Sequence, residues 1–332
     1  MKNYLEKVLA HQYLTEHEAY SAMQAMGSGN QDEAILASFI TAMMMRPVGV
    51  EELNGFRKAL LDLCTPISFE QDSYIDLCGT GGDGKNTFNI STLSSFVAAG
   101  AGVKVAKHGN YGVSSVSGSS NVLEYLGIQF TNKQDELQRQ LNEAGICFLH
   151  APLFHPALKN VGPIRKKLGV KTFFNILGPM VNPARPNKQL VGVFNLEVAR
   201  NYNYVFQKSD KDYLILHALD GYDEISGTGP VKYYGNTGEG TIYPDEFLGR
   251  LLKEEELHSG DSVESAARIF IEVLENKGTE AQQKIVCMNA AAAIHLFNKG
   301  LTMQDAYAMA TESLESGAAL RSFQKLHKTI NA

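Results

Sequence analysis

The chain has 332 residues, a hydrophobic fraction of 44% and a formal net charge of -6 at pH 7. This length allows a large core and two domains, and the acidic balance disfavours a general nucleic-acid-binding protein. No apolar run reaches the length of a transmembrane helix, and the first residues do not resemble a signal peptide. The four cysteines are far apart in the sequence, so we expect free thiols in a reducing cytoplasm.

Residues 1 to about 64 are predicted to be wholly helical. Capping-box patterns at 15–18 and 30–33 precede Ala- and Met-rich helices, the second of them over 35–45. A further helix over 50–63 carries an apolar stripe. Such broad apolar faces need a partner surface, which is either the rest of the domain or a second copy. We expect these helices to form a homodimer contact.

From residue 74 the pattern changes to alternating strands and helices. Strands are predicted over 74–78, 103–107, 146–150, 189–194 and 213–219. Helices are predicted between them, over 92–99, 119–126, 134–144 and 197–207. Two strand-like segments and three long helices follow, over 231–235, 240–243, 262–276, 280–298 and 302–328. This alternation predicts an α/β fold in which helices flank a central, mainly parallel sheet.

The first strand runs into a glycine-rich loop. Four glycines lie within residues 79–84, and hydroxyl side chains at the start of the next helix follow at 91–92. Glycines let backbone N–H groups converge on one point, and a helix N-terminus also favours anions. We therefore expect a phosphate site, although a tight turn with an ordinary helix cap is the alternative. Lys85 is followed by Asn86, so the loop is neither a P-loop nor a Rossmann motif.

A second strand leads into another Gly- and Ser-rich loop, over 107–119. Here we expect Ser119 or Ser120 to cap the next helix, and Lys107 to supply a mobile charge for phosphate. His108 is either a general base or a hydrogen-bond donor that fixes the loop. Because parallel strands present their carboxyl ends at one edge, the two loops predict one extended ligand with several phosphates.

Two other stretches bear on the site. Asp223 and Glu224 follow the strand at 213–219, and their repulsion would be relieved by Mg²⁺ shared with substrate phosphates. A polar turn is the alternative, but opposite a phosphate loop the metal site is favoured. The proline-rich and locally basic segment 155–183 interrupts the strand–helix alternation, with two short helices at most.

Together these motifs resemble the anthranilate phosphoribosyltransferase family. The resemblance rests on residues 79–83, 89–92, 107–110 and 223–224, and it continues through 155–158, 163–165 and 172–179. It covers nearly the whole chain in order. Tyr222 departs from the pattern, because a smaller apolar residue is expected there. Two rivals are a pyrimidine nucleoside phosphorylase-like enzyme, which needs no acidic metal pair, and a non-catalytic nucleic-acid-binding relative.

The resemblance implies transfer of the 5-phosphoribosyl group of 5-phosphoribosyl 1-diphosphate (PRPP) to the amine of anthranilate, in tryptophan biosynthesis. It implies a helical domain over 1–70, completed by 155–183, and an α/β domain over 71–154 and 184–332. The substrate cleft lies between them. Two Mg²⁺ ions are expected, and no acid or base is assigned. Catalysis would be electrostatic, through Lys107, Asp223 and Glu224.

The site residues that the resemblance implies fall into three sets. Those for PRPP are Gly79, Gly82, Asp83, Thr87, Asn89, Ile90, Ser91, Thr92, Lys107, His108, Gly109, Asn110, Ser114, Ser115 and Ser119. Those for anthranilate are Gly79, Asn110, His155 and Arg165, whose guanidinium suits a planar carboxylate. The metal ligands are Ser91 with Glu224 for one ion and Asp223 with Glu224 for the second.

Overall fold

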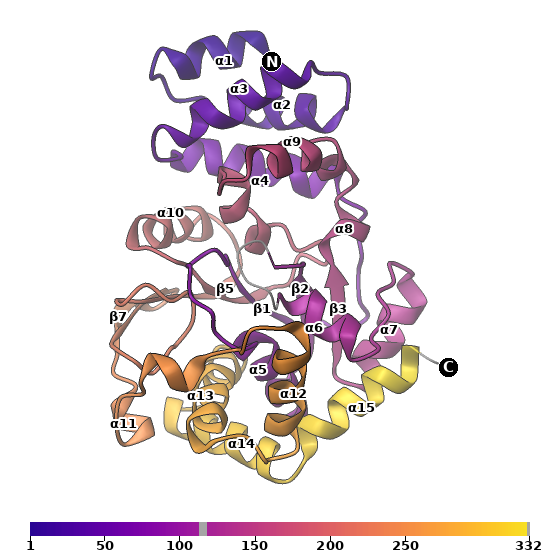
Figure 1. Cartoon of the computed structure of the whole chain (residues 1–332), viewed down its shortest axis with the longest axis vertical. Helices are drawn as coiled ribbons and strands as arrows, with labels where there is room; N and C mark the ends of the chain where they lie inside the picture. Colours follow the sequence, from indigo (N-terminus) through magenta and orange to yellow (C-terminus); the bar gives the residue numbers. More distant parts are fainter. Residues whose placement is uncertain (113–117, 331–332) are drawn as a thin grey trace.

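The computed structural model describes residues 1–112 and 118–330. A helical bundle lies at one end of the molecule, on top of an α/β body (Figure 1). Its helices are α1 (Lys2–Leu9), α2 (Glu16–Gly27), α3 (Glu33–Met44) and α4 (Val50–Leu63).

The helix starts of the bundle test the two predicted capping boxes. The first is confirmed, because the Thr15 side chain accepts from the backbone N–H of Glu18. The second is wrong. Asp32, and not Asn30, caps α3, and its carboxylate accepts from the N–H groups of Ala34 and Ile35. A carboxylate at this position also complements the helix dipole.

The body is built on one seven-stranded sheet with the order β3-β2-β1-β4-β5-β6-β7. Its strands are β1 (Ile75–Gly79), β2 (Val105–Gly109), β3 (Ile146–His150), β4 (Lys188–Gly192), β5 (Asp212–Ala218), β6 (Val231–Gly235) and β7 (Gly238–Ile242). Strands β1 to β5 are parallel, and β6 and β7 add an antiparallel hairpin. The mainly parallel sheet is thus confirmed. The strand order reverses at β1, so its carboxyl end is where such folds bind ligands.

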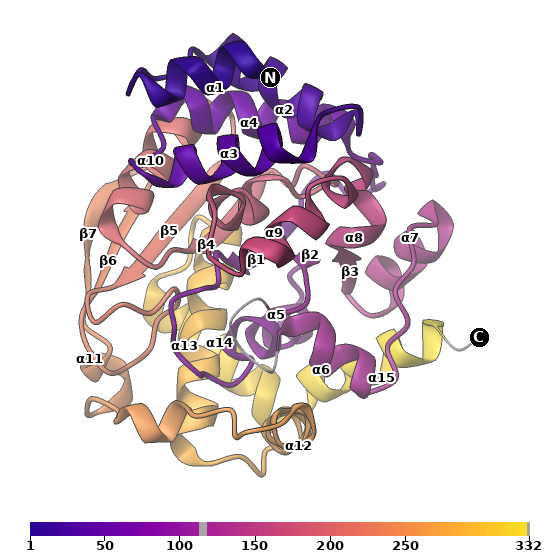
Figure 2. The ribbon, with the colours of Figure 1, turned by 45° about the horizontal axis from the view of Figure 1, so that its top comes forward.

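One face of the sheet is covered by helices that lie between the first strands and by helices that follow the last strand (Figure 2). They include α5 (Ile90–Gly100), α6 (Ser119–Tyr125), α12 (Val263–Leu274), α13 (Glu280–Phe297), α14 (Met303–Glu315) and α15 (Ala318–Ile330). The single helix expected over 302–328 is wrong. Gly317, with φ of 72°, separates α14 from α15 because a left-handed residue cannot continue a helix.

The other face packs against α10 (Leu196–Phe206) and the bundle, while α7 (Gln134–Glu143) covers the β3 edge. Two short elements, α11 (Asp245–Leu248) and η4 (Glu254–Leu257), follow the hairpin. In the part of the chain that is described, none of the helices combines the length and apolar character needed to cross a membrane.

The segment after β3 is more structured than its prolines suggest. It holds α8 (Ala151–Phe154), η1 (Pro156–Lys159), α9 (Gly162–Leu168), η2 (Phe173–Ile176) and η3 (Gly178–Met180), so the expectation of two short helices at most is wrong. The segment packs on the bundle. The ring of Phe173 lies 4.8 Å from that of Phe56 and 6.5 Å from that of Phe39, between ring centroids. Burial of these aromatic rings holds η2 against α3 and α4.

Candidate active site

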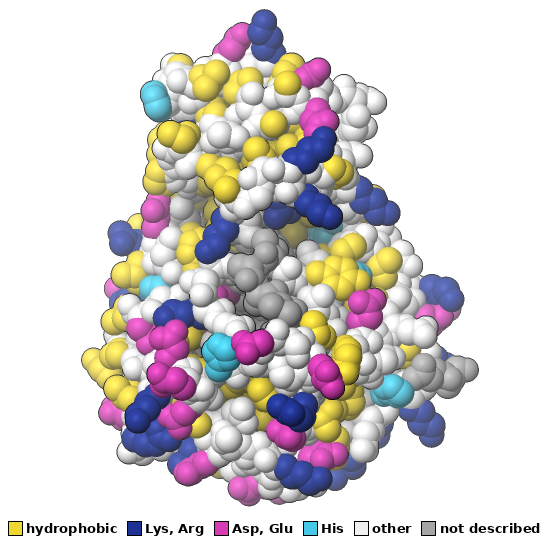
Figure 3. Space-filling view, viewed as in Figure 1, with side chains coloured by type: hydrophobic (Ala, Val, Ile, Leu, Met, Phe, Trp, Pro, Cys, Tyr) yellow, Lys and Arg dark blue, Asp and Glu magenta, His cyan; other side chains and the backbone are white. Residues whose placement is uncertain are grey.

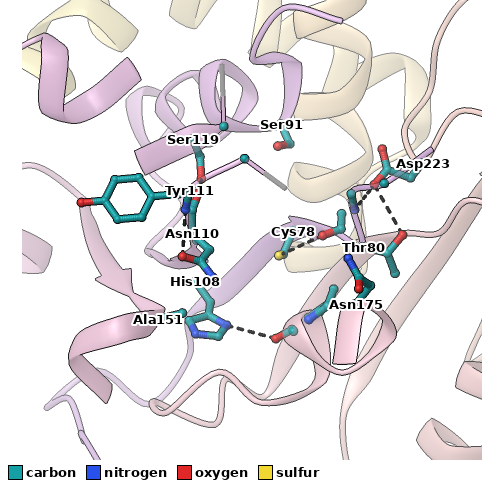
Figure 4. Close-up of a pocket in the computed structure, with 18 of the residues that line it drawn as sticks. Cys78, Thr80, Ser91, His108, Asn110, Tyr111, Ser119, Ala151, Asn175 and Asp223 are labelled. Carbon is teal, nitrogen blue, oxygen red and sulfur yellow. Dashed lines mark hydrogen bonds between the residues drawn. The ribbon is translucent and has the colours of Figure 1, made fainter. Parts of the chain in front are cut away.

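A pocket of about 270 Å³ opens at the carboxyl ends of β1 and β2, where the body meets the helical region (Figure 4). Its walls come from the loops after β1, β2 and β5, from the start of α5, and from the segment 151–183. Lys and Arg side chains gather on the surface along this boundary (Figure 3).

The pocket brings together the site residues predicted from the sequence. Every described residue of the PRPP, anthranilate and metal sets lines it: Gly79, Gly82, Asp83, Thr87, Asn89, Ile90, Ser91, Thr92, Lys107, His108, Gly109, Asn110, Ser119, His155, Arg165, Asp223 and Glu224. Ser114 and Ser115 lie outside the described residues. Segments more than a hundred positions apart thus share one cavity, although the role of each residue stays a prediction.

Two glycines at strand ends let the acidic loop approach the sheet. A Cβ added to Gly79 would lie 2.5 Å from Asp223 Oδ2, and one added to Gly192 would lie 1.4 Å from the Asp223 carbonyl oxygen. Neither contact is possible for a real side chain. The positive φ values of Gly81 and Gly82, 63° and 75°, then turn the loop back over this carboxylate.

The carboxylates beside the glycine loop repel one another. Asp223 Oδ2 accepts from the N–H of Gly81 at 2.6 Å, and burial together with Asp83 raises the pKa of Asp223 to about 7. Burial and then Asp223 raise the pKa of Glu224 well above its usual range. Glu224 Oε1 is buried and has no hydrogen-bond partner within the described residues. Mutual repulsion and an orphaned oxygen are what a bound cation would relieve.

These carboxylate oxygens suit Mg²⁺ that is shared with a substrate better than a metal ion that the protein holds alone. Over residues 1–112 and 118–330, no group of three or more His, Cys, Asp or Glu side chains could hold an ion by itself. Mg²⁺ is usually bound by one or two carboxylates, with water and substrate phosphates completing the shell. The acidic pair Asp223 and Glu224 matches that pattern.

Lys107 is not the mobile charge that the sequence suggested. It lies on β2 with 2% of its surface exposed, and its Nζ donates to the carbonyl of Leu77 on β1. Burial lowers its pKa, while the nearby carboxylates, among them Glu224 and Asp223, oppose that shift. A lysine that is buried on a strand and hydrogen-bonded through Nζ to the neighbouring strand cannot swing toward a ligand. Lys107 is therefore a fixed positive charge beneath the pocket.

His108 sits across the pocket from Asp223 (Figure 4). Its backbone N–H donates to Asp76 Oδ1 at 3.0 Å, and its Nδ1 lies 3.1 Å from the carbonyl oxygen of Gly178. Burial, with His155 next, lowers its pKa to about 3. A neutral imidazole with Nδ1–H donating to a carbonyl favours the loop-fixing role over the general base, because so weak a base accepts few protons near pH 7.

Arg165, on α9, carries an unpaired charge at the far wall. Its guanidinium carbon lies 5.0 Å from the centre of the Phe174 ring, and its Nε is buried without a hydrogen-bond partner among the described residues. Burial lowers its pKa. Lying over the ring holds the planar fork in place. The fork is thus available to a carboxylate of a ligand.

The second loop is held differently from the prediction. Helix α6 is capped by Gly118, without a side-chain bond, and not by Ser119 or Ser120. A Cβ on Gly118 would lie 1.9 Å from the backbone nitrogen of Gly112, so this close approach requires glycine. Ser119 Oγ instead donates to the carbonyl of Asn110 at 3.2 Å, which joins the two ends of the loop.

Sequence reasoning missed two contacts around the glycine loop. The Nζ of Lys171 donates to the carbonyl of Gly82. The Nζ of Lys85 lies 4.5 Å from the centre of the ring of Tyr222, the unexpected residue before the acidic pair. Lys171 belongs to a basic run that is typical of solvated surface, so only the folded chain could single it out. Tyr222 could be recognised in the sequence as a departure from the family pattern, but its contact with Lys85 could not.

Comparison with known families matches both parts of the chain. Residues 71–320 match "Glycosyl transferase family, a/b domain", and residues 2–64 match "Glycosyl transferase family, helical bundle domain".

Curated relatives and solved structures agree with this. The anthranilate phosphoribosyltransferase of Flavobacterium johnsoniae is 55% identical over 328 residues, 99% of each chain. That of Bacteroides thetaiotaomicron is 48% identical over 332 residues, 100% of each. The structure of the Thermus thermophilus enzyme superimposes with a TM-score of 0.91 at 31% identity, covering 99% of each chain. The Saccharomyces cerevisiae enzyme in complex with PRPP and Mg gives 0.90 at 27% identity, covering 99% of this chain and 97% of that one.

Proposed function

Because this chain belongs to the anthranilate phosphoribosyltransferase family, we propose that its pocket divides the two substrates between two walls. The family reaction is part of tryptophan biosynthesis and moves the 5-phosphoribosyl group of PRPP to anthranilate. The observation that carries the proposal is the opposite charge of the walls. The acidic pair Asp223 and Glu224 lies beside the glycine loop, and Arg165 lies on the segment that faces it.

PRPP would lie along the strand ends of the α/β body. The N–H groups of residues 79–83 and the hydroxyl of Ser91 would bind its diphosphate, and the fixed charge of Lys107 would stabilise it as it leaves. Thr87, Asn89 and Thr92, with the loop 107–119, would hold the ribose and the 5-phosphate. A yeast relative was solved in complex with PRPP and Mg, which supports PRPP as the ligand.

Mg²⁺ fits the acidic side of the pocket. We propose that Ser91 and Glu224 hold one ion, and Asp223 with Glu224 a second. Bound there, Mg²⁺ neutralises charge on the diphosphate. The two carboxylates would orient the metal-bound diphosphate against the glycine loop. Asp223 already contacts that loop, because it accepts a hydrogen bond from the Gly81 N–H.

Anthranilate would lie against the segment 151–183. Arg165 would bind its carboxylate, while Gly79, Asn110 and His155 would surround the ring and amine. A yeast relative was solved in complex with 4-fluoroanthranilate, which supports a site for this substrate class. The aromatic amine loses its proton readily once the new bond forms, so the neutral His108 need not act as a strong base. The chain's contribution is positioning and electrostatics.

A direct assay tests this function. Purified protein with PRPP, anthranilate and Mg²⁺ should consume anthranilate, seen as a change in its fluorescence, and release diphosphate, and removing Mg²⁺ with a chelator should abolish both. Phosphate-dependent cleavage of a pyrimidine nucleoside, without transfer to anthranilate, would instead support the phosphorylase alternative. Binding of single-stranded nucleic acid without either reaction would support the non-catalytic relative.

We propose that the helical domain comprises residues 1–70 and 155–183, because α9 shares a core with the bundle. We also propose a homodimer through its helices. Large apolar side chains are exposed on the bundle: Leu9 at 61%, Tyr13 at 53%, Met44 at 37% and Met45 at 77%. A second copy would cover them. Light scattering at micromolar concentration should give twice the chain mass of 36.4 kDa, and a monomer mass would overturn the proposal.

The cytoplasm is the compartment we propose. All four cysteines, Cys64, Cys78, Cys147 and Cys287, are free thiols in the structure. Free and largely buried thiols suit a reducing compartment.

A further inference from the structure

A second cavity lies under α4, at the amino ends of β4 and β5, and shares no lining residue with the active-site pocket. Its volume is about 200 Å³. Arg57 and Leu61 reach it from α4, and Arg185 and Lys211 line it from the segments that lead into β4 and β5. The cavity therefore lies where the helical bundle meets the α/β body.

Arg57 is the unusual residue in this cavity. Among residues 1–112 and 118–330 its guanidinium has no ion pair, and its Nε is buried without a hydrogen-bond partner. Burial lowers its pKa, and the charge of Arg185 adds to the effect. A buried cation without a partner is costly, and folded proteins normally pair such groups.

The two neighbouring basic residues, Lys211 and Arg185, give the Arg57 guanidinium no counter-charge. Among the described residues, Lys211 Nζ donates to the neutral side chain of Gln189, at 3.1 Å, and to no carboxylate. Burial and then Arg57 lower the pKa of Lys211 to about 7, and Asp76 opposes that shift. Arg185 donates to the carbonyl of Leu61 at 3.0 Å.

The acids near the cavity are already engaged. Asp62 Oδ1 is 3.5 Å from Arg185, and its Oδ2 accepts from the hydroxyl of Tyr20 at 3.2 Å. Asp76 accepts from Asn182, whose amide forms part of the cavity wall. Lys58, at the rim, is paired with Glu16. Four basic side chains thus line the cavity, and Asp62 is the one carboxylate among its described lining residues.

We propose that this cavity binds a small dianionic oxyanion, of the phosphate or sulfate type, between Arg57, Arg185 and Lys211. Guanidinium forks match the oxygen spacing of such anions, and a dianion suits the excess positive charge better than a monoanion. The bound anion joins α4 of the bundle to the α/β body. The site is independent of the transfer reaction, because none of its residues lines the active-site pocket.

The test compares Arg57→Met with Arg268→Met. Arg268 lies on α12, and 72% of its side chain is exposed, so the control removes the same charge by the same substitution away from the cavity. The melting temperature of each protein is measured in a zwitterionic buffer, with sulfate, phosphate or chloride added at equal ionic strength. Sulfate that occupies the active-site pocket affects all three proteins alike and cancels in the comparison.

Wild type and Arg268→Met should gain about 2–5 °C more from sulfate or phosphate than from chloride, whereas Arg57→Met should lose most of that gain. Without oxyanion, Arg57→Met should melt at or above the wild-type temperature, because the substitution removes an unpaired charge. Equal oxyanion gains in all three proteins would overturn the proposal. A response to phosphate but not sulfate would narrow the ligand to phosphate compounds and support the site.

Discussion

The two walls of the active-site pocket carry opposite and separately unbalanced charges. On the α/β side, burial raises the pKa values of Asp83, Asp223 and Glu224, and repulsion from neighbouring carboxylates adds to the shifts of Asp223 and Glu224. On the facing side, burial lowers the pKa values of Arg165 and His155. Neither wall neutralises the other inside the chain, since the acids form no ion pair with Arg165 in the described structure.

The difference teaches which wall depends on which ligand. An acidic cluster with an orphaned oxygen needs a cation, and it can bind a diphosphate only when that cation comes with it. A guanidinium that lies on an aromatic ring needs an anion, and a carboxylate on a flat ring fits that geometry. Removing charge from one wall should therefore affect one substrate, and the predictions below test that separation.

The largest effect is expected from the acidic wall. The double variant Asp223→Asn with Glu224→Gln should lower kcat/KM by about 10³-fold, because diphosphate charge is no longer balanced through these ligands. Its thermal stability without Mg²⁺ should equal or exceed that of wild type, because burial and repulsion already disfavour negative charge on both carboxyl groups. Steady-state kinetics and calorimetric titration of PRPP with and without Mg²⁺ measure both effects.

Asp220→Asn is the matched control for the acidic wall. Asp220 lies in the same loop but accepts from the hydroxyl of Thr228 and does not line the pocket. Its variant should keep the Mg²⁺ dependence of PRPP binding. If the double variant retained full activity, or if the control lost as much, the metal role of the pair would have to be abandoned.

Local sequence signals predicted this acidic wall well. A strand followed by four glycines, and a strand followed by Asp223 and Glu224, place their ends at one sheet edge by topology alone. What the sequence could not give is the close packing there. That Gly192 makes room for the carbonyl of Asp223 depends on β4 lying beside β1. Strand neighbours depend on the whole fold and not on the local pattern.

The opposite wall was harder to predict. Its elements are short and partly 3₁₀ helices between prolines, where periodicity is too brief to read. Arg165 was identified only through the family resemblance, and the stacking ring of Phe174 beneath it was not anticipated. Lys107 shows the same limit, because its burial on β2 and its hydrogen bond to β1 rule out the mobile role that its place before a loop suggested.

On the basic wall, Arg165→Ala should raise the anthranilate KM by roughly ten- to a hundredfold, equivalent to about 1.5–3 kcal/mol for a charge-assisted hydrogen-bonded fork. PRPP binding should remain intact. Arg165→Lys should restore only part of the loss, because an ammonium cannot offer the planar bidentate geometry. Kinetics with each substrate varied in turn measure the separation. Equal damage to both substrate affinities would show that Arg165 acts on the whole cleft.

The buried histidine that lines the same wall, His155, predicts an acid sensitivity. Burial lowers the pKa of His155 from 6.5 to about 4. Below pH 6.5 His155 binds a proton in the unfolded chain but not in the folded chain. The free energy of unfolding therefore falls as the pH drops from 6.5 toward 4. At pH 5.5 the cost is about 1–1.5 kcal/mol.

Urea unfolding at pH 7.5 and 5.5 measures that cost for His155. The variant His155→Gln should lose less stability between these two pH values than wild type. His17→Gln, at an exposed position of α2, is the control and should behave as wild type. If His155→Gln and wild type lost equal stability, the histidine would not be held neutral by the fold.

The smallest effect is expected where the walls touch. Lys171, from the segment that carries Arg165, donates to the carbonyl of Gly82 in the glycine loop. The side chain is exposed, so the bond contributes at most about 1 kcal/mol to stability. Because it steadies the loop that binds diphosphate, Lys171→Met should raise the PRPP KM about two- to fivefold and leave the anthranilate KM unchanged.

Lys166→Met removes the same charge from the same basic run, at an exposed position that does not line the pocket. This variant separates the effect of the hydrogen bond between Lys171 and Gly82 from the effect of the segment's overall positive charge. If both variants raise the PRPP KM equally, the effect is long-range attraction of an anionic substrate, and it should disappear at high salt. If only Lys171→Met does so, and the effect persists at high salt, the contact itself couples the segment to the loop. The two walls would then be linked at Gly82 and would not act as wholly separate sites.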